Sequence, residues 1–243
     1  MIKLTDRLQV LADQIEKCET MADIGTDHGF LPIYLWENGI SPKVIMADVS
    51  AGSLDKARRN AAALYPDVAF DLRLGDGIQI LQNGEVDAVV LAGMGGILMT
   101  EILSTDLEKS QSFRKYIFQP RSGQGRLRWW LVNHGFFITR ELLVREGKYI
   151  CEIITATPES ADGAGNDPPI SRVIEGCGPE DIQYEVPPWI WSAGELTEAF
   201  LKKKIFIEEQ ILQGLEKGRQ VDQKKRLFTE NRIMYLESLL GGV

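Results

Sequence analysis

The chain has 243 residues, of which 35 are acidic and 27 are basic, and its formal net charge at pH 7 is −8. A chain of this length can bury a full hydrophobic core, so it needs neither disulfides nor a structural metal ion. The negative charge excludes broad electrostatic wrapping of nucleic acid, and any such contact must be local. From Glu195 onward the chain carries nine basic and eight acidic side chains, so the acidic excess lies in the first 194 residues.

The three cysteines are odd in number and widely spaced, which is typical of a reduced protein. With two histidines and no Cys-x-x-Cys motif, we expect no metal site. The first residues contain no apolar core of signal-peptide length, and the longest apolar stretch, 86–99, is interrupted by Asp87 and three glycines. We therefore expect a cytoplasmic protein without a membrane segment.

The first elements are a helix, a strand and a second helix. Leucine and isoleucine recur every three or four residues over 4–17, which predicts an amphipathic helix capped by Thr5 or Asp6. Residues 20–24 predict a strand, 25–29 a tight polar turn and 30–36 a helix.

Two aspartates, Asp23 and Asp27, stand on either side of that turn. In an open α/β sheet, ligands bind where a strand ends and the chain turns into a helix. Two carboxylates would repel a pyrophosphate there, so the turn favours a ligand with hydroxyl groups or positive charge. Alternatively, Asp27 only caps the helix.

The next elements complete a βαβ unit. Residues 43–49 predict a strand that ends in Asp48, and 50–64 predict a helix capped by Ser50. Asp48 stands 23 residues after Gly25, a position from which a carboxylate can bind both hydroxyls of a ribose. The alternative is a solvated carboxylate in a loop.

The third and fourth strands each run into a glycine-containing turn. Strand 68–74 precedes Asp76 and Gly77. At this turn the backbone can approach a flat ligand, and the Asp76 carboxylate can accept a hydrogen bond from an exocyclic amine. The alternative is a plain Asp-Gly turn without a ligand. Strand 86–91 is followed by Ala-Gly-Met-Gly-Gly at 92–96 and then by a predicted helix over 97–103. These small residues leave open space at the edge of the sheet.

The remaining strands close the sheet. Residues 116–119 predict a fifth strand, 125–134 a helix, and 136–144 with 149–156 a final pair of strands. This order predicts an α/β fold with a doubly wound, mostly parallel sheet and an antiparallel edge strand.

The last part of the chain changes character. Residues 159–169 read as a loop, and 186–191 should be extended because proline resists helix. From residue 195 the pattern predicts two antiparallel helices with a turn between Gly214 and Gly218. Their basic side chains form either a solvated face or a phosphate contact. The expected apolar stripes are Phe200, Ile207, Ile211 and Leu215 on one helix and Val221, Phe228, Tyr235 and Leu239 on the other.

The turn after the first strand bears on which ligand binds. A nicotinamide enzyme would need Gly-x-Gly-x-x-Gly, but this turn reads Gly-Thr-Asp-His-Gly, with carboxylates where phosphate would lie. Carboxylates at the ends of the first three strands instead match a ligand with a ribose, an adenine and a positive centre but no phosphate. S-adenosylmethionine is such a ligand.

Three stretches carry a resemblance to a known family: Met-Ala-Asp-Ile-Gly-Thr-Asp-His-Gly-Phe-Leu-Pro at 21–32, Ala-Gly-Met-Gly-Gly at 92–96, and Gln119-Pro120. In this order they resemble the bacterial TrmK family of tRNA methyltransferases, which methylate N1 of adenine 22. The similarity extends from residue 4 to about residue 156. It implies a class I, Rossmann-like methyltransferase domain, which we place at 1–157, and a coiled-coil hairpin that helps to bind tRNA, which we place at 195–243. Between them we expect an irregular linker over 158–194.

The resemblance also implies roles for single residues. Asp27 would act on the target base, and His28 would orient the base or the carboxylate unless it is only structural. The cofactor would lie against Asp23 and Gly25 at its methionine end, Asp48 at its ribose, and Asp76 with Gly77 at its adenine. The flipped target base would take the space along Gly93, Met94, Gly95 and Gly96.

Two departures from the family pattern stand near this site. The family has Ala-Tyr where this chain has Gly29-Phe30, and Asn after Gln-Pro where this chain has Arg121-Ser122. We therefore predict an S-adenosylmethionine-dependent tRNA adenine-N1 methyltransferase. The alternatives are a methyltransferase for another RNA or a small molecule, and a non-catalytic RNA-binding adaptor that retains the fold. The four aspartates argue against an adaptor.

Overall fold

The computed structural model describes residues 2–159, 168–216 and 222–241. Over these residues seven strands form one sheet in the order β3-β2-β1-β4-β5-β7-β6. The strands β1 to β5 run parallel, β7 is antiparallel to β5, and β6 is antiparallel to β7. The predicted fold class is therefore confirmed. The strands are β1 (Met21–Ile24), β2 (Val44–Asp48), β3 (Asp71–Leu74), β4 (Ala88–Met94), β5 (Lys115–Pro120), β6 (Phe136–Glu146) and β7 (Tyr149–Pro158).

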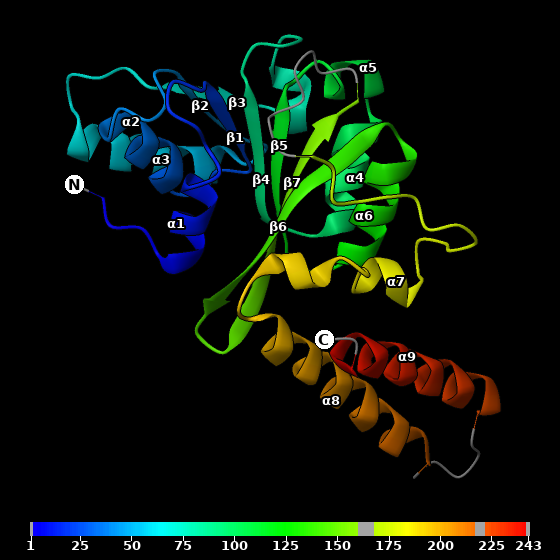
Figure 1. Ribbon diagram of the computed structural model, residues 1–243. Helices are drawn as coiled ribbons and strands as arrows, with labels where there is room; N and C mark the ends of the chain where they lie inside the picture. The colour runs from blue at the N-terminus through cyan, green and yellow to red at the C-terminus, as the bar shows by residue number, and fades with distance from the viewer. Residues whose placement is uncertain (1, 160–167, 217–221, 242–243) are drawn as a thin grey trace.

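Helices cover both faces of the sheet. Figure 1 shows α1 to α3 on one face and α4 to α6 on the other, with α8 and α9 standing apart as a hairpin. The helices are α1 (Asp6–Ala12), α2 (Phe30–Glu37), α3 (Ala51–Leu64), α4 (Gly96–Ser104), α5 (Leu107–Ser110), α6 (Gln124–Asn133), α7 (Ile182–Glu185), α8 (Thr197–Glu216) and α9 (Gln223–Gly241). Two 3₁₀ turns, η1 (Gly77–Ile80) and η2 (Ile190–Ala193), complete the described elements.

The central strands alternate between the two faces, as the period of a strand requires. On β1, Ala22 and Ile24 pack with the core under α4 and α6, whereas Met21 packs with the core under α1 and α2. Asp23 follows Met21 by two residues and faces the same side. A carboxylate is therefore buried in the middle of an apolar sheet, beneath α1 and α2.

The first helix is shorter than the predicted 4–17. Thr5 caps it, since its side chain accepts a hydrogen bond from the Leu8 N–H, but the helix ends at Ala12. Cys18 has a φ of +76°, which no helix allows, and its N–H donates to the Ile40 carbonyl at 2.7 Å. This contact with the loop before β2 turns the chain into β1.

The segment before the hairpin is not extended as predicted for 186–191. The chain makes α7, then a turn through Trp189, and then η2. Prolines at the start of a helical turn lose no hydrogen bond, which is why Pro187 and Pro188 can precede η2. Val186, Ile190 and Ala193 of this segment form a core with Phe200 and Leu201 of α8 and Leu236 of α9.

The hairpin itself departs from the predicted stripes. The helix α8 continues through Gly214 to Glu216, so the turn begins later than predicted, and Gly218 and Val221 lie outside the described residues. Phe200 is buried, but Ile207, Ile211 and Phe228 are exposed. Among the described residues, the apolar side chains of the hairpin are buried at the end that rests on α7, η2 and the strands β6 and β7, because these elements cover them there. Whether 1–157, 158–194 and 195–243 behave as separate units remains a prediction.

Candidate active site

The turn after β1 is built from two glycines with positive φ. Gly25 and Gly29 have φ values of +85° and +70°, and the Gly25 and Thr26 N–H groups donate to the Ala47 carbonyl of β2 at 2.8 and 2.9 Å. Gly29 is the N-cap of α2, and no side chain caps that helix. The alternative in which Asp27 is only a helix cap is therefore wrong.

Gly25 packs closely against the end of the Met94 side chain, and its φ of +85° favours glycine. A Cβ atom there would lie 2.8 Å from the Cε atom of Met94. Gly29 is equally close-packed, since a Cβ atom would lie 2.9 Å from the Met46 sulfur and 3.2 Å from the Ala57 Cβ. The glycine that replaces the family's alanine at position 29 therefore fits the packing of α2 on α3 in this chain.

A cavity of about 280 Å³ opens beside this turn. It brings together Asp23, Gly25, Asp27, His28 and Gly93, five of the residues that the sequence singled out. Arg7 and Leu8 of α1 close its other side. Neither of these two was predicted to line the site.

Asp23 is the most buried acid of this cavity. Burial raises the pKa of its carboxyl to about 6, the nearby Asp48 adds to the rise, and Thr26 and Arg7 oppose it. A positively charged ligand in the cavity would favour the ionised form of this carboxyl.

Asp27 and His28 lie at the exposed rim of the same cavity. The Asp27 side chain is 53% exposed, and its two oxygens contact the Lys56 Nζ at 2.8 Å and the His28 Nε2 at 3.1 Å. The hydrogen bond from Lys56 is the main reason that the pKa of Asp27 is lowered. The His28 ring stacks on Phe30 with centroids 5.3 Å apart. Asp27 is thus ionised at neutral pH and forms an ion pair with Lys56.

The other predicted cofactor residues lie along the same edge but outside this cavity. Asp48 ends β2, and its Oδ1 accepts from the Ser50 N–H at 2.6 Å. Asp76 and Gly77 line a separate hollow of about 120 Å³ between η1 and α4. A Cβ atom at Gly77 would lie 2.8 Å from Ile102, so this turn also requires glycine.

A second and larger cavity, of about 510 Å³, adjoins the first. Arg7 and Gly93 line both cavities and so stand at their boundary. The Arg7 Nε lies 3.0 Å from each carboxylate oxygen of Glu146, and its Nη1 donates to the Gln119 Oε1 at 3.1 Å. The remaining lining residues are Pro120, Arg121, Gln124, Tyr149, Ile150 and Cys151.

Gly93 has open space around it, unlike the neighbouring glycines Gly95 and Gly96. The register between β4 and β5 shifts at Gly93, whose φ is +78°, and a Cβ atom there would meet nothing within 4 Å. Gly96 instead packs on the loop before α6, where a Cβ atom would lie 2.3 Å from the Gly123 carbonyl oxygen. Of the four residues expected to give the target base room, only Gly93 lines the described cavities. Met94 covers Gly25, and Gly95 and Gly96 start α4.

A metal-binding cluster and a membrane-spanning helix are both absent from the described part of the chain. In the stretches that the structure describes, no group of three or more His, Cys, Asp or Glu side chains is arranged to hold a metal ion. None of the described helices is both long and apolar enough to span a membrane.

Known proteins resemble this chain in sequence. A family model for a methyltransferase domain matches residues 4–154. The tRNA (adenine(22)-N(1))-methyltransferase of Bacillus subtilis is 31% identical over 163 residues, which cover 67% of this chain and 68% of that protein. The chain belongs to the bacterial TrmK family.

Solved structures of TrmK proteins share the fold over almost the whole chain. The B. subtilis m1A22 tRNA methyltransferase TrmK superposes with a TM-score of 0.80 at 24% identity, covering 98% of this chain and 99% of that one. The M. capricolum TrmK in complex with S-adenosylhomocysteine gives a TM-score of 0.73 at 24% identity, covering 97% and 96%. The common architecture thus includes the C-terminal helices as well as the methyltransferase domain.

Within this TrmK fold, sequence reasoning missed Glu146, Gln119 and Arg7 as site residues. Gln119 belongs to a stretch that carries the family resemblance, and Arg7 lies near the start of the region of similarity, so a signal for these two was present. Glu146, the last residue of β6, lies 139 positions from Arg7 and gave no such signal.

Proposed function

We propose that this protein transfers the methyl group of S-adenosylmethionine to N1 of adenine 22 in tRNA. The observation that carries the proposal is the pair of adjoining cavities that share Gly93 and Arg7. A methyl transfer needs a cofactor site and a nucleophile site that touch at one point, with donor and acceptor aligned across it. Family membership supplies the identity of the two ligands.

The residues of the first cavity fit the cofactor. The buried carboxylate of Asp23 suits its positively charged methionine end, and Gly25 and Gly93 let the ligand approach the backbone. Asp48 at the end of β2 can accept from the ribose hydroxyls, and Asp76 with Gly77 can hold the adenine. When bound, the cofactor supplies a methyl group activated by a sulfonium charge.

The larger cavity would take the flipped adenine. The N1 lone pair forms the bond to the methyl carbon, the carbon–sulfur bond breaks with its electrons left on sulfur, and the positive charge passes to the base. Carboxylates near the base stabilise that charge as it develops. Glu146 lines the larger cavity and Asp27 the rim of the smaller one, so both can serve this role.

The decisive experiment measures methyl incorporation from labelled S-adenosylmethionine into unmodified tRNA transcripts, followed by nucleoside mapping. The expected product is N1-methyladenosine at position 22, and a transcript with guanosine at that position should accept no label. Label at another nucleoside of the transcript would show that the enzyme methylates a different position. Cofactor binding without transfer to any tRNA would contradict the proposal, and a complete lack of cofactor binding would favour the adaptor alternative.

Asp27→Ala should reduce kcat at least roughly tenfold while leaving the affinity for the cofactor nearly unchanged. The reason is that Asp27 lies at the rim, tied to Lys56 at 2.8 Å, rather than in the buried part of the cavity. Steady-state kinetics with calorimetry of cofactor binding would separate the two effects. Asp55→Ala is the matched control, because Asp55 is an exposed carboxylate that pairs with Arg59 on α3 and should change neither quantity. An equal loss of kcat and cofactor affinity in Asp27→Ala would move Asp27 into the cofactor site.

A further inference from the structure

The larger cavity has an exposed aromatic side chain at its mouth. Tyr149, the first residue of β7, lines this cavity and is 59% exposed. Its hydroxyl makes no hydrogen bond to any residue that the structure describes. The ring is thus held at the surface without a polar anchor.

Two lysines from different elements lie over this ring, and their flexible side chains must turn toward the phosphate for a base to stack on it. The Nζ atoms of Lys148 and Lys203 lie 5.3 and 5.5 Å from its centroid. Lys148 belongs to the turn between β6 and β7, whereas Lys203 belongs to α8, and its Nζ donates to the Lys148 carbonyl at 3.2 Å. Figure 1 shows the tip of this strand hairpin reaching the beginning of α8. The cluster therefore joins the catalytic sheet to the helical hairpin.

Neither lysine is neutralised. Within residues 2–159, 168–216 and 222–241, no carboxylate lies within 4 Å of the Lys148 or the Lys203 Nζ. Arg121, which lines the same cavity, also lacks an ion pair over these residues. By contrast, Lys204, the next residue of α8, is paired with Glu185. In a chain of net charge −8, the mouth of this cavity is a local concentration of unpaired positive charge.

An exposed aromatic ring beside free cations is the chemistry that binds single-stranded nucleic acid. Bases stack on aromatic side chains without regard to sequence, and cations bind the phosphodiester beside them. Flipping a base out of its stack also leaves its neighbours without a stacking partner. A platform at the mouth of the base cavity would replace that partner.

We propose that Tyr149, Lys148 and Lys203 form a platform for a nucleotide next to the methylated adenine, with its base on the tyrosine ring and its phosphate between the lysines. This inference rests on the proposed function, because it assumes that the larger cavity receives the target base. It also gives α8 a direct contact with RNA within reach of the site.

The test compares the binding of an unmodified tRNA transcript to variants in the presence of S-adenosylhomocysteine, between 50 and 200 mM salt. Tyr149→Ala should weaken binding about 5- to 150-fold, whereas Tyr149→Phe should bind like the wild type because only the ring is used. The double variant Lys148→Ala/Lys203→Ala should also bind more weakly, and the slope of its salt dependence should fall by about 0.7, the value for one single-strand phosphate that is no longer neutralised. Lys17→Ala, at an exposed lysine in the loop before β1, should change nothing.

Calorimetry of cofactor binding and thermal melting should give wild-type values for all of these variants. Wild-type affinity in Tyr149→Ala, or an equal loss in Tyr149→Phe, would overturn the platform. These readouts do not depend on turnover. A wild-type protein that binds tRNA but methylates none would refute the proposed function, while the comparison of binding among the variants would still test the platform.

Discussion

Replacing Arg128 by methionine is expected to lower the free energy of unfolding by about 3–5 kcal/mol, the cost of removing one partner from a buried ion pair. Arg128 lies on α6 and is fully buried. Its Nε and Nη2 donate to the two oxygens of Glu141 at 2.9 Å each, and Nη2 also donates to Glu152 at 2.6 Å. Without the guanidinium, two buried carboxylates would face each other with no cation between them.

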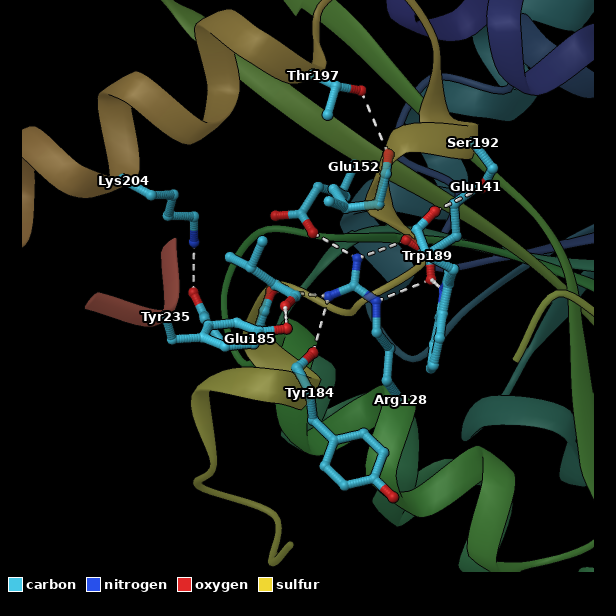
Figure 2. Close-up of polar contacts among 12 residues, drawn as sticks. Arg128, Glu141, Glu152, Tyr184, Glu185, Trp189, Ser192, Thr197, Lys204 and Tyr235 are labelled. Carbon is cyan, nitrogen blue, oxygen red and sulfur yellow. Dashed lines mark hydrogen bonds and ion pairs between the residues drawn. The ribbon is translucent and has the colours of Figure 1, made fainter. Parts of the chain in front are cut away.

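The same guanidinium reaches beyond the sheet. Its Nη1 donates to the carbonyl oxygens of Tyr184 and Glu185 at 3.1 and 3.0 Å, and the Glu185 carboxylate in turn pairs with Lys204 of α8. Figure 2 shows Arg128 at the centre of these contacts. The loss of Arg128 would therefore weaken the packing of α8 against α7 as well as the pairing of β6 with β7.

Chemical denaturation at pH 7 measures the effect. The matched control is Arg126→Met on the same helix, because Arg126 is 49% exposed and its ion pair with Glu180 spans 3.4 Å. Such an exposed pair contributes at most about 1 kcal/mol. A loss of similar size in the two variants would contradict the assigned role of Arg128.

The pH dependence of Arg128→Met carries a second signature. Burial already raises the pKa of Glu152 in the intact protein, and removal of the cation should raise it further. An acid whose pKa is raised by folding binds more protons in the folded than in the unfolded state. Between the two pKa values, the variant should therefore recover part of its stability as the pH falls. A variant that only loses more stability on acidification would rule out this account.

Local signals in the sequence predicted much of the fold. Short apolar runs, caps at Thr5 and Ser50 and glycines after the strands indicated the parallel strands and the helices between them. Each such signal depends on residues that are close in the chain. The failures have the same origin: the end of α1 depends on a contact between Cys18 and Ile40, and the shape of 186–191 depends on packing against α8 and α9.

Of the two cavities, only the smaller one, beside the turn after β1, was predictable from the sequence. Asp23, Gly25, Asp27 and His28 share one turn, so a strand–turn–helix pattern was enough to bring them together. The larger cavity needs Arg7 and Glu146, which are distant in sequence and meet only after β6 and β7 have paired. Likewise, no signal in the sequence indicated that Arg128 is buried, because its carboxylate partners lie on β6 and β7.

The largest effect on the cofactor is expected from Asp23→Asn. The amide keeps the shape of the side chain but cannot carry the charge that a positively charged ligand requires. A hydrogen bond to a charged group contributes about 1.5–3 kcal/mol, so the affinity for S-adenosylmethionine should fall roughly 10- to 150-fold at pH 7. In the wild type the affinity should fall about tenfold per pH unit below the pKa of about 6, and the variant should lack this dependence.

The same substitution should make the protein more stable. Folding raises the pKa of Asp23 from its ordinary value near 4 to about 6, so at pH 7 the ionised side chain destabilises the folded state by about 2–3 kcal/mol. That penalty disappears as the pH falls below the unfolded-state pKa, and Asp23→Asn removes it at every pH. Asp67→Asn, at an exposed aspartate before β3, should change neither stability nor affinity. If Asp23→Asn melts at or below the wild-type temperature at pH 7, the carboxylate is not held at an energetic cost. A gain in stability together with a loss of cofactor affinity would show that the charge is kept for the ligand rather than for the fold.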